Sequence, residues 1–176
     1  MIKLYARYVC LTAGLLFVQT SSLLPLGRHG IRPDLVLFVV LHAAVSVPAV
    51  QSACIVFIAA FFLEALSGAP TGFFIVTYLL VFTAVKTLCR VFNFNTLIEL
   101  FGLLLVCLAA KHMFLCFFAH FVYEYHYDYM VQTVLRETFF TLILFPVVFP
   151  LVQKCIPPTP SPDGVGPHRK YHGTRV

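Results

Sequence analysis

The sequence predicts an all-α fold, a polytopic membrane helix bundle of about six transmembrane helices. Hydrophobic residues make up 60% of the 176 residues and charged residues only 11%. A soluble domain is typically about 25% charged, so this chain has too few charges for a surface that faces water. A spanning helix takes roughly 20 apolar residues, and six of them leave only short connections and a tail. There is no room for a separate soluble catalytic domain.

The first apolar run covers about residues 8–26 and follows Lys3 and Arg7. This start resembles a signal peptide, but it lacks a convincing small-x-small cleavage site and further apolar runs follow, so we expect an uncleaved first helix. A second run covers about residues 32–47, and a third continues to about residue 66. Each is short for a full span and polar residues separate them, which predicts a tight hairpin or a partly re-entrant pair.

Strong helix breakers delimit the later elements. Residues 67–72 contain two Gly and one Pro and form the clearest turn in the chain. Three further helices are expected, over about residues 73–88, 97–122 and 138–152. The last of them contains Pro146 and Pro150. Each proline removes a helical hydrogen bond, so we expect this helix to be kinked.

Basic residues indicate the orientation. With six alternating spans, eight of them lie on the side of the N-terminus and three on or near the other side. The first group is Lys3, Arg7, Lys86, Arg90, Lys154, Arg169, Lys170 and Arg175, and the second is Arg28, Arg32 and Arg136. Because Lys and Arg are enriched on the cytoplasmic side, we expect both termini in the cytoplasm. We divide the chain into one integral membrane helical domain, residues 1–154, and a Pro-rich tail, residues 155–176, that we expect to be disordered.

Glu64 is the first charged candidate. An ionisable residue within a span costs roughly 2.5–3.5 kcal/mol at mid-helix, so it merits a functional hypothesis. Glu64 lies near the end of the third run, just before Ser67 and Gly68. Its carboxylate can accept hydrogen bonds from backbone N–H groups at the start of the next helix. We favour this structural role, and a contact with a partner protein or a proton or substrate role remain alternatives.

The segment Arg32, Pro33 and Asp34 opens the second run. Pro33 suits the first turn of a helix because its missing N–H has no intrahelical partner there, and Asp34 favours the positive end of the helix. We therefore interpret the segment as a helix start held at the outer interface. Arg32 departs from the positive-inside bias, which suggests that it pairs with Asp34, a lipid phosphate or a partner protein.

Lys111 lies deep in the fifth run, next to His112. Glu99, in the same run, is about 18 Å away along a helix, too far to pair with it. We expect Lys111 to snorkel toward the outer interface. A functional charge that faces the interior of the bundle is the alternative.

The sequence offers no motif for catalysis. It contains no Gly-rich phosphate loop, no His-Glu-x-x-His and no Gly-x-Ser-x-Gly. Glu124, His126 and Asp128 alternate with tyrosines that are typical of an interfacial aromatic belt, and a fourth metal ligand is missing nearby. The basic residues flank apolar runs, so topology explains the net charge of +5 better than nucleic-acid binding does. We expect no enzyme, cofactor, metal or nucleic-acid partner, and a lipid bilayer as the surroundings.

Two short motifs occur in a characteristic order. Residues 32–35 read Arg-Pro-Asp-Leu and open an apolar hairpin, and residues 62–72 read Phe-Leu-Glu-Ala-Leu-Ser-Gly-Ala-Pro-Thr-Gly before a helix that ends in Lys86 and Arg90. This order resembles the rod-shape-determining MreD family, which has an Arg-Pro-Asp or Arg-Pro-Asn helix start and an acidic-x-x-Ser-Gly-x-x-x-Gly turn. The resemblance covers roughly residues 28–95. This chain departs from it with Glu where the family usually has Asp, and with Ala where Gly is expected in the third run.

The resemblance implies a noncatalytic component of the bacterial inner membrane. Such proteins bind MreC, a bitopic periplasmic protein, and help to link MreB filaments to the peptidoglycan synthases RodA and penicillin-binding protein 2. Their fold is similar to the substrate-binding subunits of energy-coupling-factor transporters, although a fold alone does not confer ligand binding. The candidate partner-binding or structural residues are Arg32, Pro33, Asp34, Glu64, Ser67, Gly68 and Gly72.

Two functions of other classes remain as alternatives. A substrate-binding membrane subunit of a vitamin or small-molecule transporter requires a polar pocket open to the outside. The expected outer loops contain few polar side chains that could orient a polar ligand. A lipid-modifying membrane enzyme requires a convergent set of acid, base or metal groups, and the sequence pattern does not bring such a set together.

Overall fold

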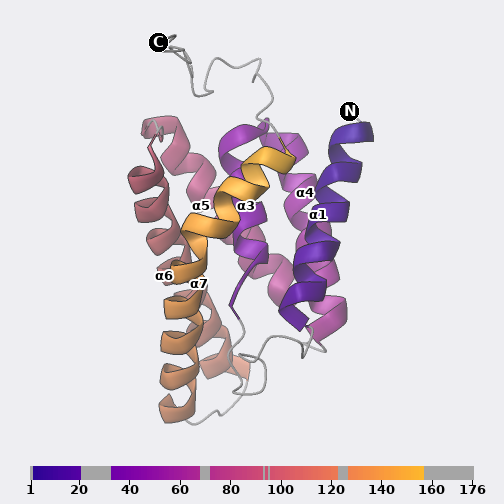
Figure 1. Cartoon of the computed structure of the whole chain (residues 1–176). Helices are drawn as coiled ribbons and strands as arrows, with labels where there is room; N and C mark the ends of the chain where they lie inside the picture. Colours follow the sequence, from indigo (N-terminus) through magenta and orange to yellow (C-terminus); the bar gives the residue numbers. More distant parts are fainter. Residues whose placement is uncertain are drawn as a thin grey trace.

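Six helices make up nearly all of the described chain. The computed structural model describes residues 2–20, 33–67, 72–92, 94, 96–122 and 127–156. The helices are α1 (Ile2–Thr20), α3 (Val36–Ser46), α4 (Ala49–Ser67), α5 (Phe73–Val91), α6 (Leu97–Val122) and α7 (Tyr127–Cys155). Successive helices run in opposite directions, so α1 begins and α7 ends at the same end of the bundle (Figure 1). The predicted all-α membrane helix bundle is confirmed, and the described residues form no strand.

Four of these helices are long and apolar enough to cross a membrane. They are α4, α5, residues 97–118 of α6 and residues 132–155 of α7. The helix α3 is apolar but has only 11 residues, and α1 is not among the four. About six spans were predicted, and the described chain has six helices of which four are long enough and sufficiently apolar to span.

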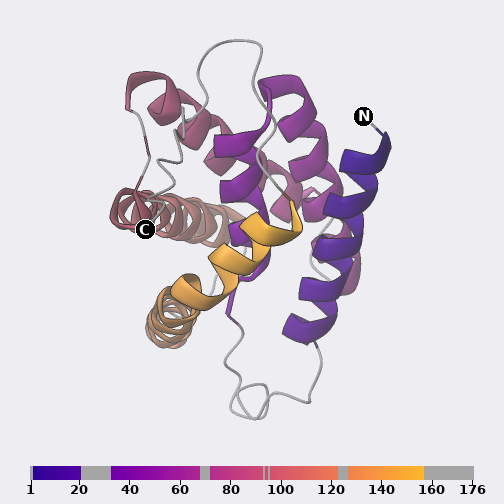
Figure 2. The same cartoon turned by 45° about the horizontal axis from the view of Figure 1, so that its top comes forward.

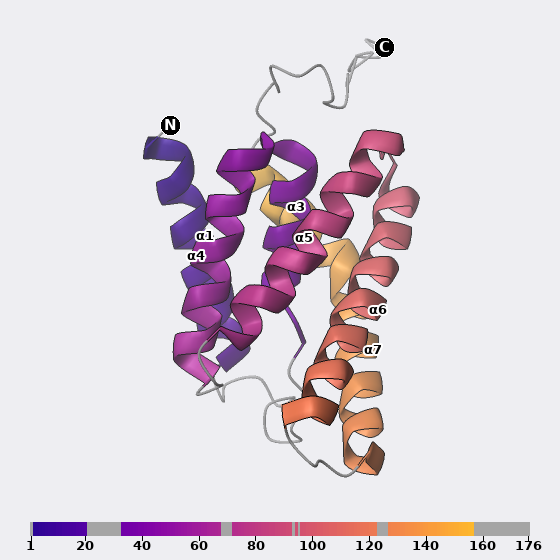
Figure 3. The same cartoon turned by 180° about the vertical axis from the view of Figure 1, so that it is seen from behind.

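Helix α3 forms the centre of the bundle. It lies between α1 and α4 on one side and α6 and α7 on the other (Figure 2 and Figure 3). Its residues 36–44 are all buried, and it packs against α1, α4, α5 and α7. It turns directly into α4, which makes the pair a tight hairpin, one of the two arrangements expected from the sequence. Because protein surrounds α3, non-helical backbone at residues 33–35 is tolerated inside the bundle.

The ends of the helices differ in part from the sequence prediction. Helix α6 has the expected bounds, and α5 begins at the expected Phe73. Helix α1 begins at Ile2, earlier than the apolar run alone indicated, and α7 begins at Tyr127 rather than near residue 138. Pro146 and Pro150 lie inside α7, which bends between its earlier and its later turns (Figure 1). The Pro-rich tail lies outside the described residues from position 157 onward.

Lys86 has a role that the count of basic residues did not predict. Its ammonium donates hydrogen bonds to the backbone oxygens of Ala44, at 2.8 Å, and Val47, at 2.7 Å. These carbonyls lie at the C-terminal end of α3, where backbone oxygens lack intrahelical partners and the helix dipole is negative. Lys86 therefore ties α5 to the end of the central helix.

We expect Lys86→Met to lower the free energy of unfolding by about 1–3 kcal/mol, because it leaves two partly buried carbonyls without their charged donor. Unfolding of the purified protein in mixed detergent micelles measures this loss. Lys154→Met is the matched control, since Lys154 is exposed in the last turn of α7. Equal stability of the two variants would show that the contacts of Lys86 contribute nothing beyond its charge.

Candidate functional site

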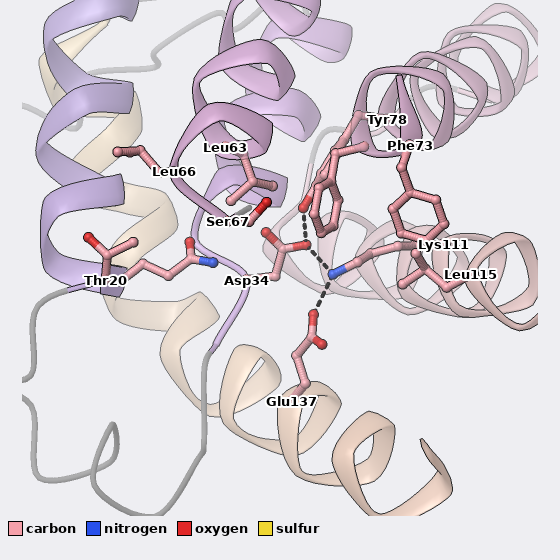
Figure 4. A pocket seen from close by; sticks show the side chains of 12 residues that line it. Thr20, Asp34, Leu63, Leu66, Ser67, Phe73, Tyr78, Lys111, Leu115 and Glu137 are labelled. Atoms are coloured by element: carbon pink, nitrogen blue, oxygen red, sulfur yellow. Dashed lines mark hydrogen bonds and ion pairs between the residues drawn. The ribbon is translucent and has the colours of Figure 1, made fainter. Parts of the chain in front are cut away.

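A pocket of about 340 Å³ lies toward the end of the bundle where α1 and α4 end and α5 begins. Side chains from α1, α4, α5, α6 and α7 and from the segment before α3 line it. The close view in Figure 4 shows how these side chains lie around the pocket. Its polar lining residues are Gln19, Thr20, Asp34, Ser67, Tyr78, Lys111 and Glu137. Its apolar lining residues are Leu63, Leu66, Phe73, Phe74 and Leu115. One side of the pocket is thus charged and the rest is mostly apolar.

The charged side of the pocket is a cluster of Asp34, Tyr78, Lys111 and Glu137, which we call the charged cluster (Figure 4). The Lys111 ammonium lies 2.6 Å from Asp34 Oδ2 and also donates to Glu137 Oε1. The Tyr78 hydroxyl donates to the same Asp34 oxygen. The Tyr78 ring centroid is 5.9 Å from the ammonium. Four elements of the fold are therefore joined through one buried lysine.

The expectation that Lys111 snorkels to an interface is wrong. The residue is only 3% exposed. A buried ammonium without partners would be very costly, but two carboxylates and an aromatic ring surround this one. Lys111 instead faces the interior of the bundle, which is the alternative that the sequence left open.

Asp34 combines a helix-start role with the ion pair. Its Oδ1 accepts a hydrogen bond from the backbone N–H of Leu37, at 3.1 Å, in the first turn of α3. Its own backbone N–H donates to Thr141 Oγ1 of α7 at 3.0 Å. Pro33 is buried just before it, and α3 begins only at Val36, so the expected place of Pro33 in the first turn of the helix is wrong. Arg32 lies outside the described residues, so its predicted pairing remains a prediction, and the cation that Asp34 contacts is Lys111.

Glu64 makes the contacts that the sequence favoured. Its carboxylate accepts hydrogen bonds from the backbone N–H groups of Gly72, of Phe74 at 3.0 Å and of Ile75 at 3.3 Å. The φ angle of Gly72 is +93°, a conformation that residues with a side chain rarely adopt. The buried carboxylate at the end of α4 thus caps the start of α5, where N–H groups have no intrahelical partner.

The other residues of the turn motif have smaller roles. The Ser67 hydroxyl donates to the backbone oxygen of Glu64 at 3.1 Å, and Ser67 lines the pocket as the last residue of α4. Gly68 lies outside the described residues. Sequence reasoning missed Tyr78 and Glu137 as members of the charged cluster. Glu137 precedes the expected sixth run by one residue, and only its position on an extended α7 brings it to the pocket.

Within the described residues, no group of three or more His, Cys, Asp or Glu side chains is placed to hold a metal ion. The side chains of Glu124, His126 and Asp128 lie outside the part of the chain that can be described. Comparison of the chain with protein-family models, curated proteins and solved structures found no match.

Proposed function

We propose that this chain is a noncatalytic scaffold of the bacterial cell-elongation complex in the inner membrane. It would bind MreC and help to couple MreB filaments to RodA and penicillin-binding protein 2. The observation that supports this proposal is the meeting of the two motifs that carry the resemblance to MreD. Asp34 of the first motif and Leu66 and Ser67 of the second line the same pocket, although they are far apart in the sequence.

The contacts within the bundle also suit a scaffold. Asp34, Lys111 and Glu64 are used to hold helices and helix starts together. A partner that docks beside such a site meets helix ends in fixed positions, which lowers the entropy lost on binding.

Two alanines of α4 are not available for a contact with MreC. Ala59 and Ala60 are 1% and 0% exposed, so they serve packing inside the bundle. The surface that remains near the second motif is the exposed end of α4, with Phe62, Leu66 and Ser67. We propose that the transmembrane helix and juxtamembrane segment of MreC dock there.

Co-purification with MreC from a rod-shaped bacterium tests the proposal. We expect Leu66→Ala and Gly68→Leu variants that insert and accumulate normally to lose MreC about tenfold, equivalent to about 1.4 kcal/mol, and to give rounded cells. The matched control is Leu151→Ala, because Leu151 is an exposed leucine of similar accessibility on α7. Full MreC binding and normal rods with both variants would contradict the proposed contact surface.

The pocket favours a second candidate function, a small-molecule-binding subunit of a membrane transporter. The sequence argued against it because the expected outer loops offer few polar side chains. In the structure, most of the charged and polar groups of the pocket come from helices, with Tyr78, Lys111 and Glu137 on α5, α6 and α7. Saturable uptake of a ligand that depends on this chain would distinguish the transporter subunit from the scaffold.

A further inference from the structure

Glu137 is the member of the charged cluster that a ligand can reach. Its side chain is 21% exposed, whereas those of Lys111 and Asp34 are 4% and 2% exposed. Lys111 donates to Glu137 Oε1. The other oxygen, Oε2, accepts no hydrogen bond from the residues that the structure describes. The pocket thus offers a carboxylate oxygen as an acceptor.

The charge of the lining favours a cation. Among the described residues that line the pocket, Asp34 and Glu137 are acidic and Lys111 alone is basic. The ammonium of Lys111 already contacts both carboxylates, so an anion would have to compete with them for it. In a site poorly exposed to water, the excess negative charge attracts a cation and repels an anion more strongly than it would in water.

The remaining walls favour an apolar body next to that cation. Phe73, Phe74, Leu63, Leu66 and Leu115 supply most of the other lining, and aromatic faces also attract cations. The volume of about 340 Å³ lies within the usual range of small-molecule pockets, about 300–1,000 Å³. The occupant would be small, with a single charged end.

We propose that this pocket binds a protonated amine carried on a small apolar body. The ammonium donates hydrogen bonds to Glu137, and the apolar part lies against Phe73 and Leu115. Two sources share this chemistry, a free amine and the ethanolamine headgroup of a phospholipid. This proposal deepens the second candidate function, a small-molecule-binding subunit of a transporter. It rests on that function in one respect, namely that the pocket must admit a ligand. The proposed MreC surface shares Leu66 and Ser67 with the pocket, but the two proposals are tested with different variants and different measurements, so failure of one can be told from failure of the other.

Calorimetric titration of the full chain in phosphatidylcholine nanodiscs tests the amine site, with empty nanodiscs subtracted. The probes are n-hexylamine, n-hexanol and hexanoate at pH about 7.5, where an amine with a pKa near that of Lys, about 10.4, is protonated. We expect saturable binding of hexylamine, at least about tenfold weaker binding of hexanol, equivalent to about 1.4 kcal/mol, and no binding of hexanoate. Equal binding of hexanol or hexanoate would overturn the proposal.

Two pocket variants and one control variant link the binding to the pocket. Glu137→Gln should weaken hexylamine binding about tenfold, whereas Glu99→Gln should leave it unchanged. Glu99 is exposed at the start of α6, where it accepts from the N–H of Thr96, a role that Gln also performs. Leu115→Trp fills the pocket without changing its charge and should abolish binding. It keeps the test decisive if Glu137→Gln does not fold. Hexylamine binding that survives in every pocket variant that folds would refute the site.

Replacing phosphatidylcholine with phosphatidylethanolamine separates the two sources. The choline headgroup has no N–H donor, whereas the ethanolamine headgroup carries a primary ammonium. Weaker hexylamine binding in phosphatidylethanolamine nanodiscs would assign the pocket to the lipid headgroup. Unchanged affinity would assign it to a free amine. Both results retain the ammonium chemistry.

Discussion

Replacing Lys111 with Met is expected to lower the free energy of unfolding by about 3–5 kcal/mol. The substitution keeps an apolar stem of similar length but leaves Asp34 and Glu137 as neighbouring carboxylates without their shared cation. Asp34 is almost fully buried, so water cannot replace the ammonium. Unfolding of the purified chain in mixed detergent micelles gives the free energy, and a reduced yield of folded protein is expected in cells.

Two controls separate the charge pairing from the loss of a side chain. Lys154→Met makes the same replacement at an exposed position in the last turn of α7 and should change stability far less. The triple variant Asp34→Asn, Lys111→Met and Glu137→Gln removes all three charges together and should recover most of the stability that Lys111→Met loses. Replacing a whole buried ion cluster with uncharged side chains often changes the free energy of unfolding little. A single Lys111→Met variant as stable as the parent chain would contradict the pairing.

Local patterns made part of this molecule predictable. Helix α6 begins after the polar connection and ends where the apolar run ends, so its bounds follow from hydropathy. The cap of α5 by Glu64 also follows from local sequence, because its hydrogen bonds reach only 8 to 11 residues ahead across a turn marked by two Gly and one Pro. Over so short a separation, chain direction and turn chemistry nearly determine the contact.

The charged cluster could not be found in the same way. Lys111 is 77 residues from Asp34 and 26 from Glu137, so only the packing of α3, α6 and α7 brings them together. Along its own helix, α6, the acidic residue is Glu99, which is too far from Lys111 to pair with it. Glu137 lay just outside the expected sixth span, because that span was drawn from the apolar run and α7 continues beyond it. Hydropathy shows that a charge is buried or interfacial, but not which distant side chain pairs with it.

The short central helix illustrates a second limit. Residues 36–46 are apolar except for His42 and Ser46 and resemble a truncated membrane span. A short apolar run fits a helix buried in protein as well as a helix in contact with lipid. The surrounding helices decide between them, since α3 is covered on every side and needs no full span length.

Replacing Glu64 with Ala is expected to cost about 2–3 kcal/mol of stability, because three backbone N–H groups at the start of α5 lose their acceptor. Glu64→Gln keeps an acceptor oxygen but loses the charge, and should cost less than Glu64→Ala. Hydrogen exchange adds a local measurement. The amides of Gly72, Phe74 and Ile75 should exchange faster in Glu64→Ala than in the parent chain, while those of α6 stay protected.

Glu99→Ala is the matched control for this cap. Glu99 also accepts a hydrogen bond from a helix-start N–H, that of Thr96, but it is exposed and water can replace it. We therefore expect a smaller loss of stability, with faster exchange confined to the start of α6. Equal losses in the two Ala variants, or unchanged exchange at the start of α5, would mean that burial of the Glu64 carboxylate adds nothing to the cap. The turn would then have to be held by its Gly and Pro residues alone, and the carboxylate would be available for a partner contact, the alternative that the sequence left open.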